Sequence, residues 1–135
     1  MNFEEKLPKS IIVHIDRFSL SRDLQLEALQ EFKELCLSSG TEVCAEVSGK
    51  IDRPSPNFFV KQGKVEEIKE LTRAHKATLV IFNNELTPSQ ERNSEKFLGA
   101  RVLDRTSLIL DIFATRASSH IGKLQVELAQ LTHLS

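Results

Sequence analysis

The chain has 135 residues, enough to bury one hydrophobic core and too few for two domains of ordinary size. Hydrophobic residues make up 40% and charged residues 27%, and no apolar run approaches the ~20 residues that a membrane-spanning helix needs, so the composition indicates a globular protein without a membrane span. The net charge of -1 provides no overall attraction to nucleic acid, so any RNA contact would depend on local basic patches.

The amino terminus and the cysteines predict a cytoplasmic protein with ordinary thiols. Residues 1–10 carry charges of both signs and lack the basic-then-apolar order of a secretory signal. Cys36 and Cys44 have no nearby cysteine and histidine cluster of the kind that binds zinc. We therefore expect both to be core thiols.

The first half of the chain alternates between strand and helix patterns. A nearly continuous apolar run at residues 11–15 predicts a strand that is covered on both faces. Apolar residues at helical spacing then predict a helix that ends at Gly40. Alternation along residues 41–48 predicts a second strand, with one polar face, at an edge of the sheet.

A loop and a second helix follow. Pro54 and Pro56 predict a loop, after which residues 57–60 are expected to add a short extended piece. One apolar stripe predicts the second helix, at Val65, Ile68 and Leu71. Glu66 and Glu67 are expected to occupy the positive end of its dipole.

The pattern continues with a central strand and a well-marked helix. Residues 77–82 form an apolar run typical of a central strand. Thr87 is placed to cap a helix with Pro88 at its first position and Gln90 completing a capping box, and Gly99 marks its end. Residues 101–104 predict a short strand.

This alternation favours an α/β fold, namely a small open parallel sheet of about four strands with flanking helices. A strand order of 2-1-3-4 would place the alternating second strand at an edge. Thr106 is expected to cap a further helix beginning at Ser107, and Ser118–Ser119 to break that stretch in two. We therefore divide the chain into an α/β domain, residues 1–117, and the start of a helical linker, residues 118–135.

Apolar residues near the end of the chain follow the spacing of a helix pair. They are Leu110, Phe113, Ala117, Ile121, Leu124, Leu128 and Leu131. Such a stripe needs a cover, so the helix folds back on the sheet, pairs with a second copy, or pairs with sequence outside this chain. The expected pairing interface is Leu124, Leu128 and Leu131.

Two long blocks, VLDRTSLILDIFA at residues 102–114 and GKLQVELAQL at residues 122–131, follow one another near the end of the chain. Shorter blocks precede them: RPSP at 53–56, GKVEEI at 63–68 and LVIFNNELTP at 79–88. Together they resemble the amino-terminal region of the HflX family of ribosome-associated GTPases. The resemblance covers about residues 50–134, and the earlier residues match only in element order. Three positions depart from the family pattern: Lys61 replaces a usual glycine, Ser94 a usual leucine and Ile121 a usual acidic residue.

The resemblance implies a small α/β domain joined to the first arm of a helical hairpin, which leads into a GTPase domain. It implies association with the large ribosomal subunit and its RNA, in the rescue or splitting of stalled ribosomes. It also implies that GTP and Mg²⁺ belong to the GTPase domain, and we expect no cofactor in this chain. Independently, the sequence contains no Gly-x-x-x-x-Gly-Lys-Ser/Thr string, which a P-loop requires, so the chain is not expected to be an enzyme.

Between Lys50 and Lys76 there are seven basic residues against four acidic ones, which is a local excess that could face RNA phosphates or simply solvent. Lys61-Gln62-Gly63-Lys64 could hold a phosphate at the start of a helix, or could be a glycine turn with solvated lysines. With the resemblance in view, the expected RNA-binding residues are Arg53, Lys61, Lys64, Arg105, Arg116 and Lys123.

Other polar residues have a functional and a structural reading. Asp104 and Arg105 follow a strand, where α/β folds place ligands, but Asp104 could instead cap the next helix while Arg105 pairs with an acid. His14 lies in an apolar strand and is expected to be a core histidine with its hydrogen bonds satisfied. Asp16, with Asp111 and Lys64, gives only a weak match to a phospho-acceptor site.

The sequence therefore predicts a binding and regulatory module of an HflX-type GTPase. Two other classes stay open. One is a self-associating module that dimerises through its last helix, and the other is a small nucleotide-binding α/β domain that rests on fold analogy alone.

Overall fold

The computed structural model describes residues 7–134, except for the side chains of residues 119, 120, 123, 124 and 126–134. The elements are β1 (Lys9–Asp16), α1 (Arg22–Ser38), β2 (Glu42–Lys50), α2 (Gln62–Ala74), β3 (Leu79–Phe82), α3 (Pro88–Leu98), β4 (Arg101–Leu103) and α4 (Arg105–Leu134). The four strands form one parallel sheet in the order β2-β1-β3-β4. The predicted fold class is confirmed, and β2 is an edge strand as its alternating pattern predicts.

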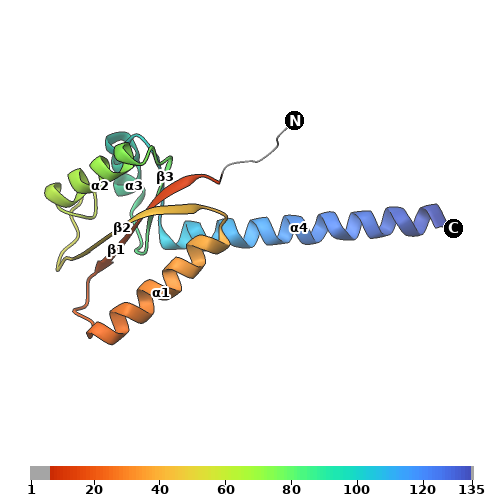
Figure 1. Cartoon of the computed structure of the whole chain (residues 1–135), viewed down its shortest axis with the longest axis horizontal. Coiled ribbons are helices and arrows are strands. Elements are labelled where there is room, and N and C mark those ends of the chain that lie inside the picture. Colours follow the sequence, from red (N-terminus) through yellow and green to blue (C-terminus); the bar gives the residue numbers. More distant parts are fainter. Residues whose placement is uncertain (1–6, 135) are drawn as a thin grey trace.

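β1 lies between β2 and β3, and its apolar side chains are buried on both faces of the sheet. Ile11 and Val13 belong to the core beneath α2 and α3, whereas Ile12 packs on the other side with Phe32 of α1 and Leu108 of α4. Figure 1 shows this three-layer arrangement, with α2 and α3 on one face and α1 and the first part of α4 on the other. The continuous β-branched run predicted for this strand is therefore explained by its central position.

Helix α3 begins and ends at the residues that the sequence predicts. The Thr87 hydroxyl accepts from the Gln90 backbone N–H at 3.1 Å, and the Gln90 side chain accepts from the Thr87 N–H at 2.8 Å, completing the capping box. Pro88 is the first helical residue, and Gly99 ends the helix at φ 67°. Because glycine has no Cβ, this left-handed geometry costs it little.

The segment at residues 57–60 is not the extended piece that the sequence predicts. Ser55 and Phe59 exchange two backbone hydrogen bonds of 2.9 and 3.0 Å, which close a tight turn. Phe59 reaches φ 69°, an uncommon conformation for a bulky side chain, and its ring is 2% exposed. Burial of the phenyl ring offsets the backbone strain, a tertiary effect that local propensity does not contain.

Two predictions for the last helix are wrong. α4 begins at Arg105, and its first turn is capped by Asp104, whose Oδ1 accepts from the Ser107 N–H at 2.9 Å, not by Thr106. The expected break at Ser118–Ser119 is absent, because α4 is one helix from Arg105 to Leu134 and crosses the proposed domain boundary at residues 117–118. Serine has only a modest helix penalty, and no proline is present to remove a hydrogen bond.

α4 does not fold back on the sheet, and it continues beyond it (Figure 1). Its buried contacts come early, at Leu108 and Ile112. In the described part of the chain, none of the helices has both the length and the apolar character required to cross a bilayer.

The fold predicts an unusual response at Ser94, which is 0% exposed and whose hydroxyl has no hydrogen-bond partner in the described structure. Ser94→Ala should raise the free energy of unfolding by about 1 kcal/mol or more, because a buried unpaired hydroxyl is removed. Urea denaturation followed by circular dichroism measures this. Ser89→Ala is the matched control, since Ser89 is an exposed residue of the same helix. Equal effects at both positions would show that the Ser94 hydroxyl has a partner.

Candidate functional site

A group of polar residues joined by hydrogen bonds lies at the carboxyl ends of the strands, where β1 and β3 leave the sheet in different directions. In parallel α/β sheets this point is the usual place for ligands. Two hollows flank the end of β1, one of about 350 Å³ toward α1 and β2, and one of about 300 Å³ toward β3 and α4. His14 and Asp16 line both hollows.

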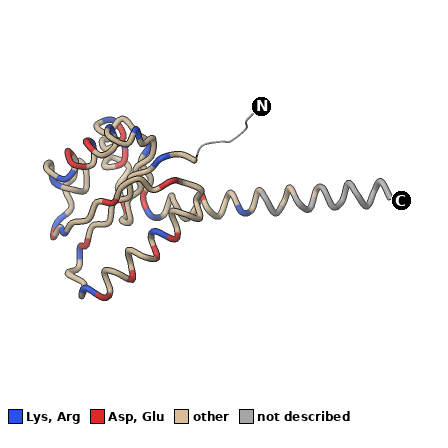
Figure 2. The backbone as a smooth tube through the Cα atoms, in the orientation of Figure 1, with Lys and Arg blue, Asp and Glu red and all other residues tan. Residues whose placement is uncertain are grey.

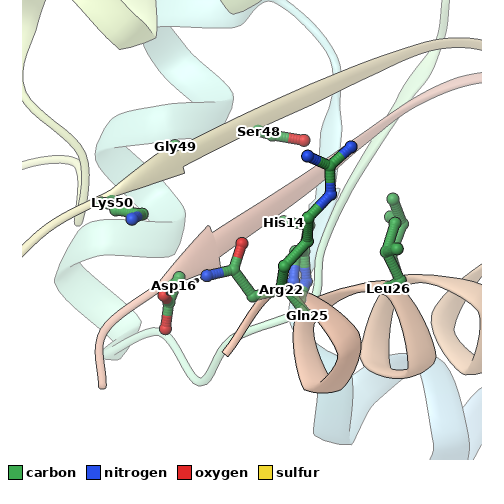
Figure 3. Close-up of a pocket in the computed structure, with 9 residues that line it drawn as sticks. His14, Asp16, Arg22, Gln25, Leu26, Ser48, Gly49 and Lys50 are labelled. Atoms are coloured by element: carbon green, nitrogen blue, oxygen red, sulfur yellow. Dashed lines mark hydrogen bonds between the residues drawn. The ribbon is translucent and has the colours of Figure 1, made fainter. Parts of the chain in front are cut away.

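Asp16 organises the loop between β1 and α1. Its carboxylate accepts from the backbone N–H groups of Phe18 at 3.0 Å and Leu20 at 3.1 Å, and from the Gln25 amide at 3.1 Å. Figure 3 shows Gln25 directed toward Asp16, with Arg22 reaching across the hollow toward Ser48 of β2. Because this buried carboxylate is already held by three donors, it acts as a loop anchor, and the phospho-acceptor reading has no structural support.

Asn84 and Asp104 fix the other loops of this edge. The Asn84 side chain donates to the Ile15 carbonyl at 2.9 Å and accepts from the Ile15 N–H at 3.3 Å, so an amide side chain continues the pairing of β1 beyond the end of β3. Asp104 accepts from the Leu86 N–H at 3.2 Å while it caps α4. The alternative in which Asp104 caps the next helix is therefore confirmed.

A chain of hydrogen bonds connects three elements across the second hollow. Arg105 forms an ion pair with Glu31 of α1 at 2.6 Å and donates to the Asn83 Oδ1 at 2.8 Å. The amide nitrogen of Asn83 lies 3.0 Å from the His14 Nδ1. Since Asn83 accepts from a guanidinium, its other end must donate, so the His14 Nδ1 is the acceptor and the ring proton lies on Nε2.

His14 is therefore held as a neutral ring, and the prediction that its hydrogen bonds are satisfied is wrong in part. Its Nε2 is buried and has no hydrogen-bond partner within the described residues. Burial lowers the pKa of His14, and the nearby Asp16 carboxylate opposes this effect in part. Protonation would also place an Nδ1–H donor against the Asn83 amide donor, which breaks the chain of hydrogen bonds.

A separate basic cluster lies where α2 begins. Lys50, Lys61 and Lys64 line a hollow of about 350 Å³ together with Gly63. Lys61 is the N-cap and makes no side-chain cap bond, and the first turn contains no acid, so the expectation that Glu66 and Glu67 occupy this end is wrong. Lys64 is partly engaged, donating to the Ser48 carbonyl at 3.0 Å and pairing with Glu67 at 3.0 Å.

The structure brings only some of the predicted RNA-binding residues together. Arg53 and Lys61 are exposed on the segment between β2 and α2, close in sequence to Lys64. Arg105 lies at the other hollow with its guanidinium paired internally, and Arg116 is exposed on α4, about 16 Å further along the helix at 1.5 Å per residue. The side chains of Lys123, Leu124, Leu128 and Leu131 lie outside the described residues, so their predicted roles stay predictions. Figure 2 shows that Lys and Arg alternate with Asp and Glu over the domain, so any basic contact surface is local.

Sequence reasoning missed the hydrogen-bond chain from Glu31 to His14. The only available signal was Asn83 and Asn84 directly after a central strand, where amide side chains can replace lost strand partners. Cys36 lies in the core as predicted, and burial raises the pKa of its thiol to about 12. Cys44 is only half-buried, at the edge strand.

Comparison with known proteins assigns the chain to a class of domain found at the amino terminus of GTPases. The model of the family described as "GTP-binding GTPase N-terminal" matches residues 26–114, well over half of the chain. The chain belongs to this family, in the form found at the amino terminus of HflX GTPases.

Curated relatives and a solved structure agree with this assignment. The chain is 48% identical over 127 residues to the GTPase HflX of Escherichia coli K12, and 42% identical over 134 residues to that of Flavobacterium psychrophilum. These matches cover 94% and 99% of this chain but only 29% and 32% of the relatives. The crystal structure of the SsGBP and GDP complex matches 92% of this chain and 34% of its own, with a TM-score of 0.63 and 26% identity.

The site predicts that acid destabilises the fold through His14. Its pKa is lowered from 6.5, so the unfolded chain binds a proton in a range where the folded chain does not. The stabilisation is complete above pH 6.5 and is lost as the pH falls toward the lowered value. His14→Gln should remove this part of the acid dependence, measured as urea midpoints from about pH 8 to about pH 5.

The matched control is His75→Gln at the C-cap of α2, which leaves His14 in place and should keep the acid-dependent loss. Parallel pH profiles for the wild-type chain and His14→Gln would show that the imidazole titrates equally in both states.

Proposed function

We propose that this chain is the binding and regulatory module of an HflX-type GTPase, and that it docks on RNA of the large ribosomal subunit and positions the GTPase domain. Under this proposal it acts in the cytoplasm and does not itself hydrolyse GTP, while GTP and Mg²⁺ bind the GTPase domain. Three findings support it: the family assignment, the lack of a P-loop string in the sequence, and carboxylates at the sheet edge that serve as loop anchors.

The observation that carries the RNA part of the proposal is the basic cluster at the start of α2. Lys50, Lys61 and Lys64 surround one hollow, and the helix end beside them has no acid in its first turn. Backbone N–H groups at a helix start and adjacent ammonium groups both favour phosphate. Arg53 is exposed on the segment between β2 and α2, three residues after Lys50.

This predicts salt-sensitive co-sedimentation with purified large ribosomal subunits. Binding should be present at low salt and fall steeply as salt rises, since each phosphate contact releases a counterion. The double variant Arg53→Ala/Lys61→Ala should bind more weakly and reduce the slope of log affinity against log salt by about 0.9 or less for each contact removed.

Lys9→Ala is the matched control, because Lys9 is an exposed lysine at the amino end of β1, at the opposite end of the strand from the basic cluster. Its salt slope should equal that of the wild-type chain. A wild-type chain that stays in the supernatant at low salt would refute docking on the subunit.

Self-association through α4 is the second candidate, and the described part of that helix supports it. Leu110, Phe113 and Ile121 are 61%, 72% and 55% exposed, at a spacing that keeps them on neighbouring positions of one stripe. An exposed apolar stripe on a monomer is a common mark of an interface.

If α4 pairs two copies, light scattering should give twice the mass of the 15.3 kDa chain, and Phe113→Glu should reduce it to the mass of one chain. Leu26→Glu on α1 is the matched control, since Leu26 is 55% exposed on a different helix and its replacement should leave the dimer intact. A wild-type monomer at all concentrations would dismiss this candidate.

A further inference from the structure

A shallow groove of about 480 Å³ lies between α2 and α3, apart from the carboxyl edge of the sheet. Its lining comprises Asn57, Phe58, Lys69, Asn93, Lys96 and Phe97. These residues come from the turn before α2 and from the surfaces of both helices. The sequence counts Lys69 only within the basic excess of residues 50–76 and predicts no binding role for the other five, since only the fold brings the three segments together.

Two phenylalanine rings form the floor of the groove. The rings of Phe58 and Phe97 are 5.3 Å apart between centroids and inclined by 49°. Both pack against the main core yet remain half-buried, whereas Phe32, Phe59 and Phe82 are at most 2% exposed. The groove therefore presents aromatic surface to solvent on a rigid support.

The strained turn before α2 explains why this surface exists. Phe59 adopts φ 69° and places its own ring in the core, while Phe58 stays at the surface beside Phe97. The Asn93 amide donates to the Asn57 carbonyl at 3.1 Å and so ties the turn to α3. Strain of this kind persists only where the surrounding structure enforces it.

The charged residues that line the groove are all positive. Its only charged linings are Lys69 and Lys96, and neither has a carboxylate within 4.0 Å among the described residues. The Lys69 ammonium lies 4.3 Å from the centre of the Phe97 ring, a cation–π contact that leaves it without an anionic partner. Asn57 and Asn93 add amide groups that can pair with a polar edge.

We propose that this groove binds an unpaired base of single-stranded RNA. The base stacks on the exposed phenylalanine surface, the asparagine amides face its polar edge, and Lys69 and Lys96 contact the flanking phosphates. Aromatic floors with flanking cations are how proteins hold single strands without reading their sequence. An apolar peptide would cover both ammonium groups without pairing them, which costs desolvation energy.

This proposal rests on the proposed function, which supplies RNA as the ligand. It adds where on the domain the RNA binds and that the bound segment is single-stranded. The groove and the basic cluster share α2, on which Lys64 and Lys69 are five residues apart, about 7.5 Å along the helix axis and about 140° around it. The two surfaces therefore lie on different faces of one helix, and the groove is tested by variants of its own residues.

The test is fluorescence anisotropy of labelled oligouridine and oligoadenosine with the 135-residue chain at low salt. Phe97→Leu keeps an apolar side chain and removes the ring, so it should weaken binding by about tenfold with an unchanged salt slope. Phe58→Leu should act in the same direction. Lys96→Gln should weaken binding and reduce the salt slope.

Matched controls use the same replacements elsewhere. Phe18→Leu changes a ring that is 77% exposed in the β1–α1 loop, and Lys9→Gln changes a lysine at the amino edge of the sheet. Both should bind RNA like the wild-type chain, and circular dichroism verifies that each variant is folded.

Equal affinities for the wild-type chain and the folded variants Phe97→Leu and Phe58→Leu would overturn the proposal, as would no binding of either oligonucleotide. An acidic peptide that binds more tightly than RNA and loses affinity in the same variants would overturn it in favour of a protein partner. Ring-dependent oligonucleotide binding without subunit co-sedimentation would sustain the groove and refute the ribosomal function. Co-sedimentation with the subunit without oligonucleotide binding would sustain the ribosomal function and refute the proposed groove.

Discussion

Burial of β1 on both faces, between two parallel neighbours, is the constraint on which the rest of the structure depends. Ile11 and Val13 are fully buried toward α2 and α3, and Ile12 is 1% exposed toward α1 and α4. A strand with no free face and no free edge can place polar groups without cost only where it leaves the sheet. Consequently the polar side chains of β1 lie toward its ends: Ser10 donates to the Glu42 carbonyl near the amino end, and His14 and Asp16 lie toward the carboxyl end.

At that end, side chains take over the hydrogen bonds that the strands can no longer provide. Asn84 pairs with both backbone groups of Ile15 after β3 has ended, and the Asp16 carboxylate receives the N–H groups of the following loop. The Asn84 carbonyl in turn accepts from the Arg105 N–H at 3.2 Å. The end of β1 and the start of α4 are thus connected through one asparagine, whose side chain and main chain serve different elements.

The sequence predicts the elements well because their signals are local. The capping box at Thr87 and Gln90, the left-handed stop at Gly99 and the apolar run of β1 each depend on neighbouring residues, and all three are found in the structure. The turn at Ser55–Phe59 was missed because the strain at Phe59 is offset by burial beneath distant elements. The candidate sites were harder still, since Glu31, Asn83 and Arg105, or Phe58 and Phe97, meet only in three dimensions.

Under the proposed regulatory role, the continuous helix α4 would connect the domain to the GTPase domain. Its first turn is fixed by the Asp104 cap, by the Arg105 bonds to α1 and to Asn83, and by the buried side chains of Leu108 and Ile112. At 1.5 Å per residue its 30 residues extend about 45 Å, so a tilt of about 5° at the base moves the far end by about 4 Å. The angle of α4 relative to the sheet therefore depends on contacts at the carboxyl ends of the strands, where Asn83 connects His14 with Arg105.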